Sequence, residues 1–393
     1  MIGAAAVAQP SLPTTSAAVR LRLTSLDIFR GLTIGAMIVV NTPGDFTRTY
    51  PPLLHAKWDH ITPTDLVFPF FLFIVGVALA AAHRSYLLSE PAAPEGRRPL
   101  DRAMYMTLGR RALGLVLLGL LINGFPGFHL ETWRIPGVLQ RIGVCSFVAA
   151  VIMVHVPLRW QCGIGATILV AYAAVLSFLG APGVMAGQLE PTANLPRWLD
   201  LAVFSKAHVL GVWPTEPEGI LSTPAAVVSV LLGCWVGVGV VNWTPSYRRG
   251  FLIIAAGLAC ATLGWAWSAA LPMVKMIWTP TYVLFSGGCA MMCFGLAYVL
   301  TDVRPPPRSM WIVHVFGRNA ILAYVLSELA AIALFNIKVY GTPFPTFVVG
   351  AIDRLSDGRI SAEMGSLSYA CLFALAIWVV LYFPYRRRWF IRI

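Results

Sequence analysis

NTPGDFTRTYPPLLHAKWDHITPTDLVFPFFLFIVG, residues 41–76, decides the fold because it places a polar loop with a histidine between two apolar helices. The apolar run before it, residues 26–40, is shorter than the roughly 20 residues that cross a bilayer. Asn41 is therefore expected at membrane depth, where Pro43 ends the helix. Irregular backbone at that depth is tolerated only against protein or a wet cavity. We therefore expect the loop that carries His55 to fold over a cavity.

The second helix of this stretch begins with its own sequence signals. Thr62 is typical of an N-cap, Pro63 suits the first helical position, and Asp65 has the spacing of the acidic partner in a capping box. Two interpretations of Asp65 stay open. Its carboxylate either caps this helix or orients the side chain of His55.

Composition defines the class of protein. The chain has 393 residues, of which 58% are hydrophobic and 12% charged, and its apolar residues form long unbroken runs. This pattern predicts an all-α polytopic integral membrane protein whose first partner is the lipid bilayer. The net charge of +12 does not indicate nucleic acid, because the basic residues lie between the apolar runs, where they act as topology signals.

The hydrophobic runs give the membrane topology. About ten spans are expected, at residues 26–41, 64–88, 102–123, 137–156, 160–180, 224–243, 250–271, 280–301, 317–336 and 364–383. About two thirds of the 29 Lys and Arg residues then lie on the side of the N-terminus. This bias predicts cytoplasmic N- and C-termini and an outer His55 loop. Residues 1–23 are interpreted as a disordered tail, and residues 24–393 as a single transmembrane domain.

Polar side chains inside the spans are functional candidates, because they are costly in a membrane. They are Asn41, Asn123, Gln140, Arg141, Asn319 and Glu328. The alternative for each is hydrogen bonding between helices, which accompanies close packing at small residues such as the pair Gly233 and Gly237. His55 joins the candidates because a titratable base and the Asn41 amide are expected at one cavity. The sequence has no His-x-x-x-His, HExxH or P-loop motif, so no metal is expected.

Several motifs together resemble the heparan-α-glucosaminide N-acetyltransferase family. In chain order they are SLDIFRG at 25–31, Asn41, HAKW at 55–58, DLVFPFF at 65–71, RIPGVLQR at 134–141, PEGIL at 217–221, Trp278 with Tyr282, and GRNAIL at 317–322 with Glu328. The resemblance extends over nearly the whole chain. It implies transfer of acetyl from cytosolic acetyl-CoA to the amino group of a glucosamine-type sugar on the far side of the membrane.

The resemblance also assigns residues. His55 matches the active-site histidine of the family, and Asn41 matches the asparagine ahead of it. To the amino-sugar acceptor we assign Asp65, Arg134, Gln140, Arg141, Glu218, Asn319 and Glu328. The phosphates of acetyl-CoA are expected at arginines of the cytoplasmic side, for which topology alone is the alternative explanation. These are Arg110, Arg111, Arg248 and Arg318.

Two chemical routes are open. His55 can act as the base that takes a proton from the amine, while the Asn41 amide donates to the developing oxyanion. Alternatively His55 is itself acetylated in a ping-pong route. Direct transfer is preferred here, because no third residue clearly orients the ring.

The short segment before the 25–31 motif, where the lysosomal enzyme has a lumenal domain, favours a compact member of a bacterial inner membrane. Its expected acceptor is a small amino sugar or a cell-wall fragment. An inner-membrane transporter for N-acetylglucosamine or such fragments is the alternative. A homodimer is left open.

Overall fold

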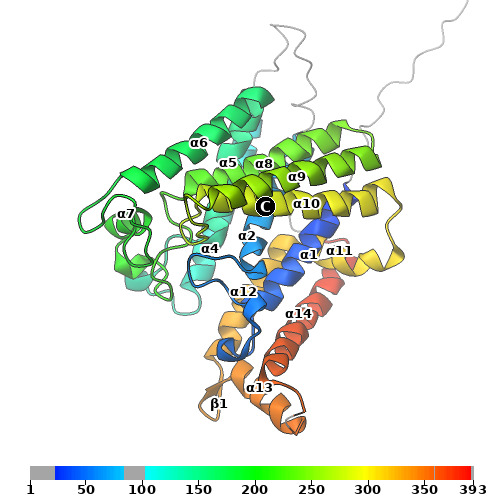
Figure 1. Cartoon of the computed structure of the whole chain (residues 1–393). Coiled ribbons are helices and arrows are strands. Elements are labelled where there is room, and N and C mark those ends of the chain that lie inside the picture. Colours follow the sequence, from blue (N-terminus) through cyan, green and yellow to red (C-terminus); the bar gives the residue numbers. More distant parts are fainter. Residues whose placement is uncertain (1–22, 84–101, 358, 391–393) are drawn as a thin grey trace, which may run out of the picture.

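The protein is a bundle of α-helices, seen in a computed structural model that describes residues 23–83, 102–357 and 359–390 (Figure 1). The helices are α1 (Thr24–Asn41), α2 (Val67–Ala82), α4 (Arg102–Gly124), α5 (Val138–His155), α6 (Leu158–Phe178), α7 (Leu195–Phe204), α8 (Thr223–Asn242), α9 (Tyr247–Trp267), α10 (Pro280–Tyr298), α11 (Trp311–Arg318), α12 (Ala320–Asn336), α13 (Phe344–Leu355) and α14 (Ala362–Arg386). A short antiparallel hairpin joins β1 (Lys338–Val339) to β2 (Thr342–Pro343) between α12 and α13.

The prediction of an all-α polytopic membrane protein is confirmed. Within the described residues, 8 helices are long and apolar enough to cross a membrane, and a bent pair raises the number to 9. The remaining expected span, the first in the chain, corresponds to α1, which has 18 residues including Asp27 and Arg30. The second expected span was predicted to end at residue 88, which lies outside the described residues. The expected N-terminal tail, residues 1–23, also lies outside them except for residue 23. The cytoplasmic location of the termini stays a prediction.

One expected span differs in shape. The ninth was predicted as a straight helix over 317–336, but α11 and α12 meet there at an angle of 69°. The break lies at Asn319, whose backbone N–H bonds to Phe316 O while its own carbonyl accepts from Ala323. Hydropathy shows no such break, because apolar residues continue on both sides.

The core forms where α2 packs along α8. A Cβ on Gly233 would lie 1.9 Å from the carbonyl oxygen of Phe73, and one on Gly237 would lie 2.7 Å from the Cβ of Ala80. Only glycine allows the two backbones to come this close. The close packing predicted from this glycine pair is therefore confirmed, and α8 becomes one of the most buried helices of the bundle.

α1 joins this core to a second one. A Cβ on Gly317 would lie 2.0 Å from the carbonyl oxygen of Asp27, so α11 lies directly against α1. The second core contains Ile34, Ile38, Val315 and Leu381, from α1, α11 and α14. In Figure 1, α12, α13 and α14 form the lower lobe of the molecule, with α1 between them and the remaining helices.

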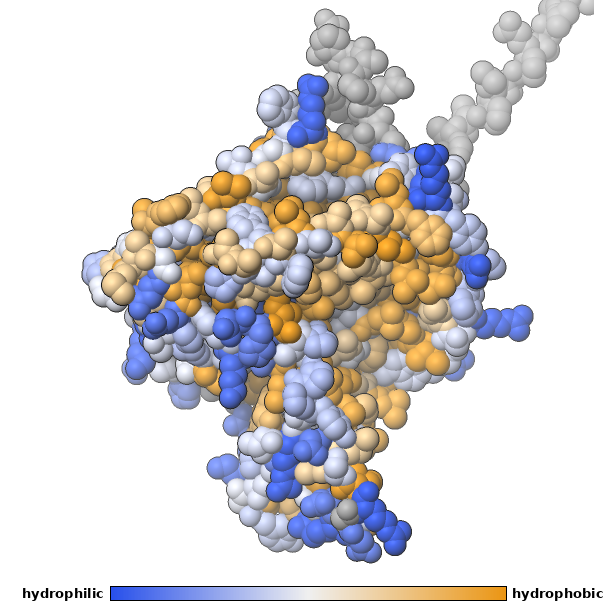
Figure 2. Space-filling view, in the orientation of Figure 1, coloured by the Kyte–Doolittle hydropathy of each residue, from blue (hydrophilic) through white to orange (hydrophobic). Residues whose placement is uncertain are grey.

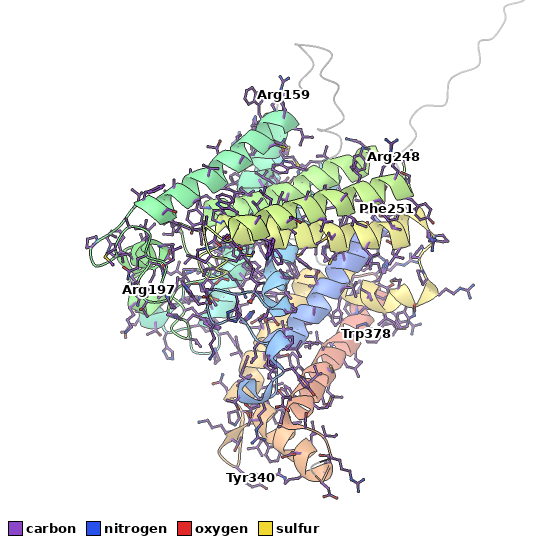
Figure 3. All side chains as sticks on the ribbon, in the orientation of Figure 1. Arg159, Arg197, Arg248, Phe251, Tyr340 and Trp378 are labelled. Atoms are coloured by element: carbon purple, nitrogen blue, oxygen red, sulfur yellow. The ribbon has the colours of Figure 1, made fainter. Side chains whose placement is uncertain are left out.

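The surface has the pattern of a membrane protein. In Figure 2 an apolar surface covers the region of α9 and α10, whereas hydrophilic residues gather at the tip of the lower lobe. In Figure 3, Arg159 and Arg248 lie in the upper part of the molecule, while Arg197 and Tyr340 lie in the lower part. Arg159 and Arg248 come from the first turns of α6 and α9, whose N-terminal ends were expected on one side of the membrane.

Candidate functional site

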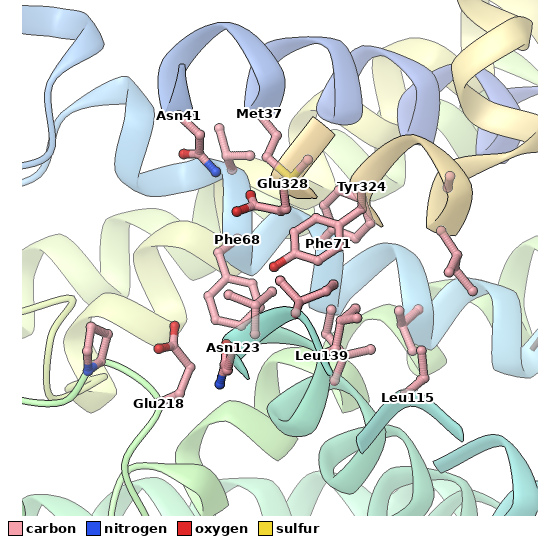
Figure 4. A pocket seen from close by; sticks show the side chains of 18 of the residues that line it. Met37, Asn41, Phe68, Phe71, Leu115, Asn123, Leu139, Glu218, Tyr324 and Glu328 are labelled. Carbon is pink, nitrogen blue, oxygen red and sulfur yellow. The ribbon is translucent and has the colours of Figure 1, made fainter. Parts of the chain in front are cut away.

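A cavity of about 1130 Å³ extends along most of α1 (Figure 4). It is lined from Asp27, in the first turn of this helix, to Asn41, its last residue, a length of roughly 21 Å at 1.5 Å per residue. Arginines and Phe390 line the end near Asp27, and residues of four loops line the end beyond Asn41. The cavity therefore connects the two ends of the bundle.

The loop end contains a cluster of three ionisable side chains. The Nδ1 atom of His55 lies 2.8 Å from Oδ1 of Asp65 and 2.8 Å from Nζ of Lys275. Lys275 Nζ also donates to Asp65 Oδ1 at 3.0 Å. His55 is the most accessible of the three, and its side chain is 30% exposed, while that of Asp65 is fully buried. The edge of the Trp213 ring packs against the imidazole, with the ring centroids 6.3 Å apart.

Asp65 fulfils both interpretations that the sequence left open. Its Oδ2 accepts from the backbone N–H and the hydroxyl of Thr62, which completes the capping box of the helix start. Oδ2 also accepts from the N–H of Ala56, next to His55, and Oδ1 contacts the imidazole. The assumption that no third residue orients the His55 ring is therefore wrong.

The segment that carries His55 is held at several points. The single hydroxyl proton of Thr62 is shared between the carbonyl of Leu54 at 2.7 Å and Asp65 Oδ2 at 3.1 Å. Trp58 Nε1 donates to the carbonyl of Leu189 at 2.7 Å. These bonds satisfy polar groups of an irregular segment that cannot form helical ones. The expectation that this loop folds over a cavity is confirmed.

Burial determines the protonation state of the cluster outside the spans. It lowers the pKa of His55 below its ordinary value of 6.5; the hydrogen bond to Asp65 opposes this shift, and the charge of Lys275 adds to it. Burial also lowers the pKa of Lys275, against the carboxylate of Asp65. A neutral imidazole at neutral pH follows, which is the form that accepts a proton.

A second cluster at the same end pairs one arginine with two carboxylates. Arg134 Nη2 lies 2.5 Å from Glu216 Oε1 and 2.5 Å from Glu218 Oε2. Glu216 also accepts the N–H of Leu210 at 2.7 Å, whereas Glu218 and Arg134 line the cavity. Burial raises the pKa of Glu218 above 4.5, although Arg134 acts against this. With both carboxylates ionised, the cluster has one more negative than positive charge.

Midway along the cavity, two helices contribute a polar pair. The side chain of Asn41 hydrogen-bonds to the carboxyl of Glu328 on α12. Figure 4 shows these two groups facing each other, with Tyr324 beside them. The expectation that Asn41 and His55 share one cavity is confirmed, because both line it.

The opposite end is cationic. Arg30, Arg111 and Arg318 line it, together with Asp27 and the ring of Phe390, over which the Arg318 guanidinium stacks at 4.1 Å. Arg111 Nε has no hydrogen-bond partner among the described residues. Two of the four arginines expected here, Arg111 and Arg318, are therefore at the cavity.

The other expected residues lie elsewhere. Arg110 and Arg248 are exposed, and Figure 3 shows Arg248 at the outer surface. Of the seven residues assigned to the acceptor, Arg134, Glu218 and Glu328 line the cavity, whereas Asp65 is fully buried behind His55. Three more are buried and do not line the cavity as the described residues define it: Gln140 donates to the carbonyl of Ile135, Arg141 to the carbonyl of Gly219 and to Ser222, and the side chain of Asn319 has no partner in the described part of the chain. For Arg141, which bonds to the start of α8, this is the alternative of hydrogen bonding between helices, whereas Gln140 bonds to the segment before its own helix.

Sequence reasoning did not identify four residues of this cavity. They are Lys275, Arg30, Trp213 and Tyr324, and Glu216 is a fifth such residue behind Arg134. A signal existed for Lys275, because it is the one charge in LPMVKMIWTPTY, residues 271–282. Such a lysine in an apolar segment needs a partner.

Fold and cavity together define a polytopic membrane protein that joins a cationic end to a His–Asp–Lys cluster and a carboxylate pair. A sequence model described as "Heparan-alpha-glucosaminide N-acetyltransferase, catalytic" matches residues 22–204. The heparan-alpha-glucosaminide N-acetyltransferase of Mus musculus is 28% identical over 370 residues, 78% of this chain and 53% of the relative. That of Homo sapiens is 27% identical over 437 residues, 95% of this chain and 60% of the relative.

The chain is therefore similar to heparan-α-glucosaminide N-acetyltransferases, the family that its motifs resemble. It spans somewhat more than half the length of these relatives. Neither relative is named as a transporter.

Proposed function

We propose that this protein is a membrane acetyltransferase that moves acetyl from acetyl-CoA to the amino group of a glucosamine-type sugar. The observation that carries the proposal is the single cavity, with three arginines at one end and His55, Glu218 and Lys275 at the other. One substrate can enter from each end and meet the other near Asn41. The family names of the relatives support the same activity.

The cationic end suits the phosphates of CoA. Guanidinium groups bind phosphate oxygens through paired, charge-assisted hydrogen bonds. Arg111 has an unused Nε, and the Phe390 ring under Arg318 offers a flat surface for an adenine. The arm that carries the thioester then extends along α1 toward Asn41. The bias of Lys and Arg residues supports a cytosolic location of this end.

The loop end suits an amino sugar. An ammonium group is attracted to a site with excess negative charge, and Glu218 offers its carboxylate beside Arg134 at the cavity wall. The bound ammonium first loses one proton to solvent, which frees the nitrogen lone pair, and His55 then takes a second proton from the nitrogen as it attacks the thioester. With Nδ1–H donated to Asp65, the lone pair of Nε2 is the base. We assign direct transfer because one cavity contains both the cationic end and His55. In a bacterium, the membrane would be the inner one and the acceptor side periplasmic.

The proposal is tested with the purified protein, acetyl-CoA and a panel of amino sugars. We expect an acetylated amino sugar by mass spectrometry and an acetyl-CoA-dependent rise in melting temperature. In Arg111→Gln, the acetyl-CoA concentration needed for the same rise in melting temperature should be about tenfold higher, because one charged hydrogen bond is lost. The adjacent Arg110→Gln, which changes an exposed residue, is the matched control. No product from any amino sugar, and no stabilisation by acetyl-CoA, would overturn the proposal.

A further inference from the structure

Lys275 occupies a position that affects the chemistry of His55 directly. Its Nζ, the Nδ1 of His55 and the Oδ1 of Asp65 form a triangle with sides of 2.8, 2.8 and 3.0 Å. A ring nitrogen has one in-plane position, which holds either a proton or a lone pair. Nδ1 therefore either donates to Asp65 or accepts from Lys275, and it cannot do both.

Asp65 stays in place in both states. Its Oδ2 is held by two donors of Thr62 and by the N–H of Ala56, and its backbone carbonyl accepts from the Tyr282 hydroxyl at 2.6 Å. The carboxylate is therefore a fixed acceptor. This acceptor favours the His55 tautomer with its proton on Nδ1, while Lys275, whose Nζ donates to the same Oδ1, places a positive charge beside the ring.

Lys275 is fixed as well. It lies in a tight turn between α9 and α10, where the N–H of Trp278 bonds to its carbonyl at 3.0 Å. The N–H of Val274 bonds to Thr279 Oγ1 at 3.0 Å, which closes the turn. The side chain of Lys275 is only 12% exposed. A buried lysine is costly unless paired, and Asp65 is its partner.

We propose that Lys275 is a positioning residue that keeps His55 neutral: the Asp65 carboxylate accepts the Nδ1–H, which leaves the Nε2 lone pair toward the cavity, and Lys275 disfavours a second proton on the ring. A cation that already donates to Asp65 opposes a second positive charge on the adjacent ring. Three side chains contact the His55 ring: Asp65 from the start of α2, Lys275 from the turn before α10, and Trp213 from the loop before α8. Glu218 and Arg134 are the charged groups farther along the wall.

The role rests on the proposed acetyl transfer. As the C–N bond forms and the C–S bond breaks, one amine proton passes to Nε2 of His55. The resulting imidazolium lies 2.8 Å from the Lys275 ammonium, which destabilises it. Its proton then passes to the thiolate of CoA, which leaves as the thiol. Lys275 thus returns His55 to its neutral form after each transfer.

The experiment measures the titration of His55 by ¹⁵N NMR in the purified full-length protein, and in parallel the pH profile of transfer. We expect wild-type His55 to carry its proton on Nδ1 and to titrate below pH 6.5. Lys275→Met should move the midpoint, and with it the acidic limb of kcat, upward by about one pH unit or more. Lys275→Arg should restore the wild-type midpoint, because it keeps the charge.

The control is Lys206→Met, which removes an exposed lysine of another loop and should leave the midpoint unchanged. Lys275→Gln, which retains a hydrogen-bond donor, repeats the test should the Met variant fail to fold. A midpoint unchanged in the neutral Lys275 variants would overturn the proposal. The NMR titration needs no turnover, so it tests Lys275 even if acetyl transfer itself is not found.

Discussion

Replacement of His55 by alanine distinguishes its catalytic role from its contribution to folding stability. The imidazole is one of several partners of Asp65, whose carboxylate keeps Lys275, Thr62 and Ala56 in the variant. The loss in folding free energy is therefore expected to be about 1 kcal/mol, the net value of one hydrogen bond. Acetyl-CoA should still bind, because the cationic end is unchanged.

The loss in rate should be much larger. A positioned general base contributes about 10² to 10⁴ in rate, or roughly 3–5 kcal/mol in activation free energy. In His55→Ala the fall should shrink as pH rises, by about tenfold per unit, until the acceptor amine is deprotonated in solution. Asn41→Ala should also lose rate but without this recovery, because hydroxide does not replace an oxyanion donor.

The assay follows acetylated amino sugar by mass spectrometry from pH 6 to 9, with melting temperatures measured in parallel. Wild-type transfer by His55→Ala at pH 7 would refute the catalytic assignment. A stable acetyl group on His55 of the wild type would show that it is the nucleophile instead. A fall in rate that matches a fall in the folded fraction would leave His55 with a structural role only.

Three further predictions follow from the same geometry. Glu218→Gln should raise the KM for the amino sugar about tenfold or more without affecting acetyl-CoA binding, whereas Glu216→Gln, whose carboxylate also holds a loop amide, should lower the melting temperature. Because burial lowers the pKa of His55, the imidazole becomes protonated, and stops acting as a base, only as pH falls through that lowered pKa. The acidic limb of kcat should therefore lie below pH 6.5, and a limb above pH 6.5 would contradict this. A reporter active only outside the cytoplasm should work after Lys57 and fail after Thr244; the reverse pattern would invert the topology.

The sequence predicted those parts of the protein that depend on local pattern. Hydropathy located the helices, and the spacing of Thr62 and Asp65 predicted the capping box. The glycine pair predicted close packing of its own helix, because such a contact depends on the absence of a side chain, but it did not identify α2 as the partner. Each of these features involves residues close in the chain or one face of one helix.

What the sequence did not predict depends on distant residues. Lys275 lies 210 positions from Asp65, and no local pattern pairs them. Arg134 was expected near Glu218, but the second carboxylate, Glu216, was not. No proline marks the bend at Asn319. The structural feature beside it is the close packing of α11 on α1 at Gly317. Such pairings follow from tertiary packing, which hydropathy does not encode.

The interruptions of regular structure explain why one cavity reaches both ends of the bundle. α1 has 18 residues, roughly 27 Å of helix, which is shorter than the ~30 Å core of a bilayer. Its last residue, Asn41, is therefore exposed to the cavity, where it meets Glu328. The bend between α11 and α12 in turn places Arg318 at the opposite end of that cavity. Two unbroken helices would present apolar faces here, so the ends of α1 and α11 are what bring Asn41 and Arg318 to the cavity.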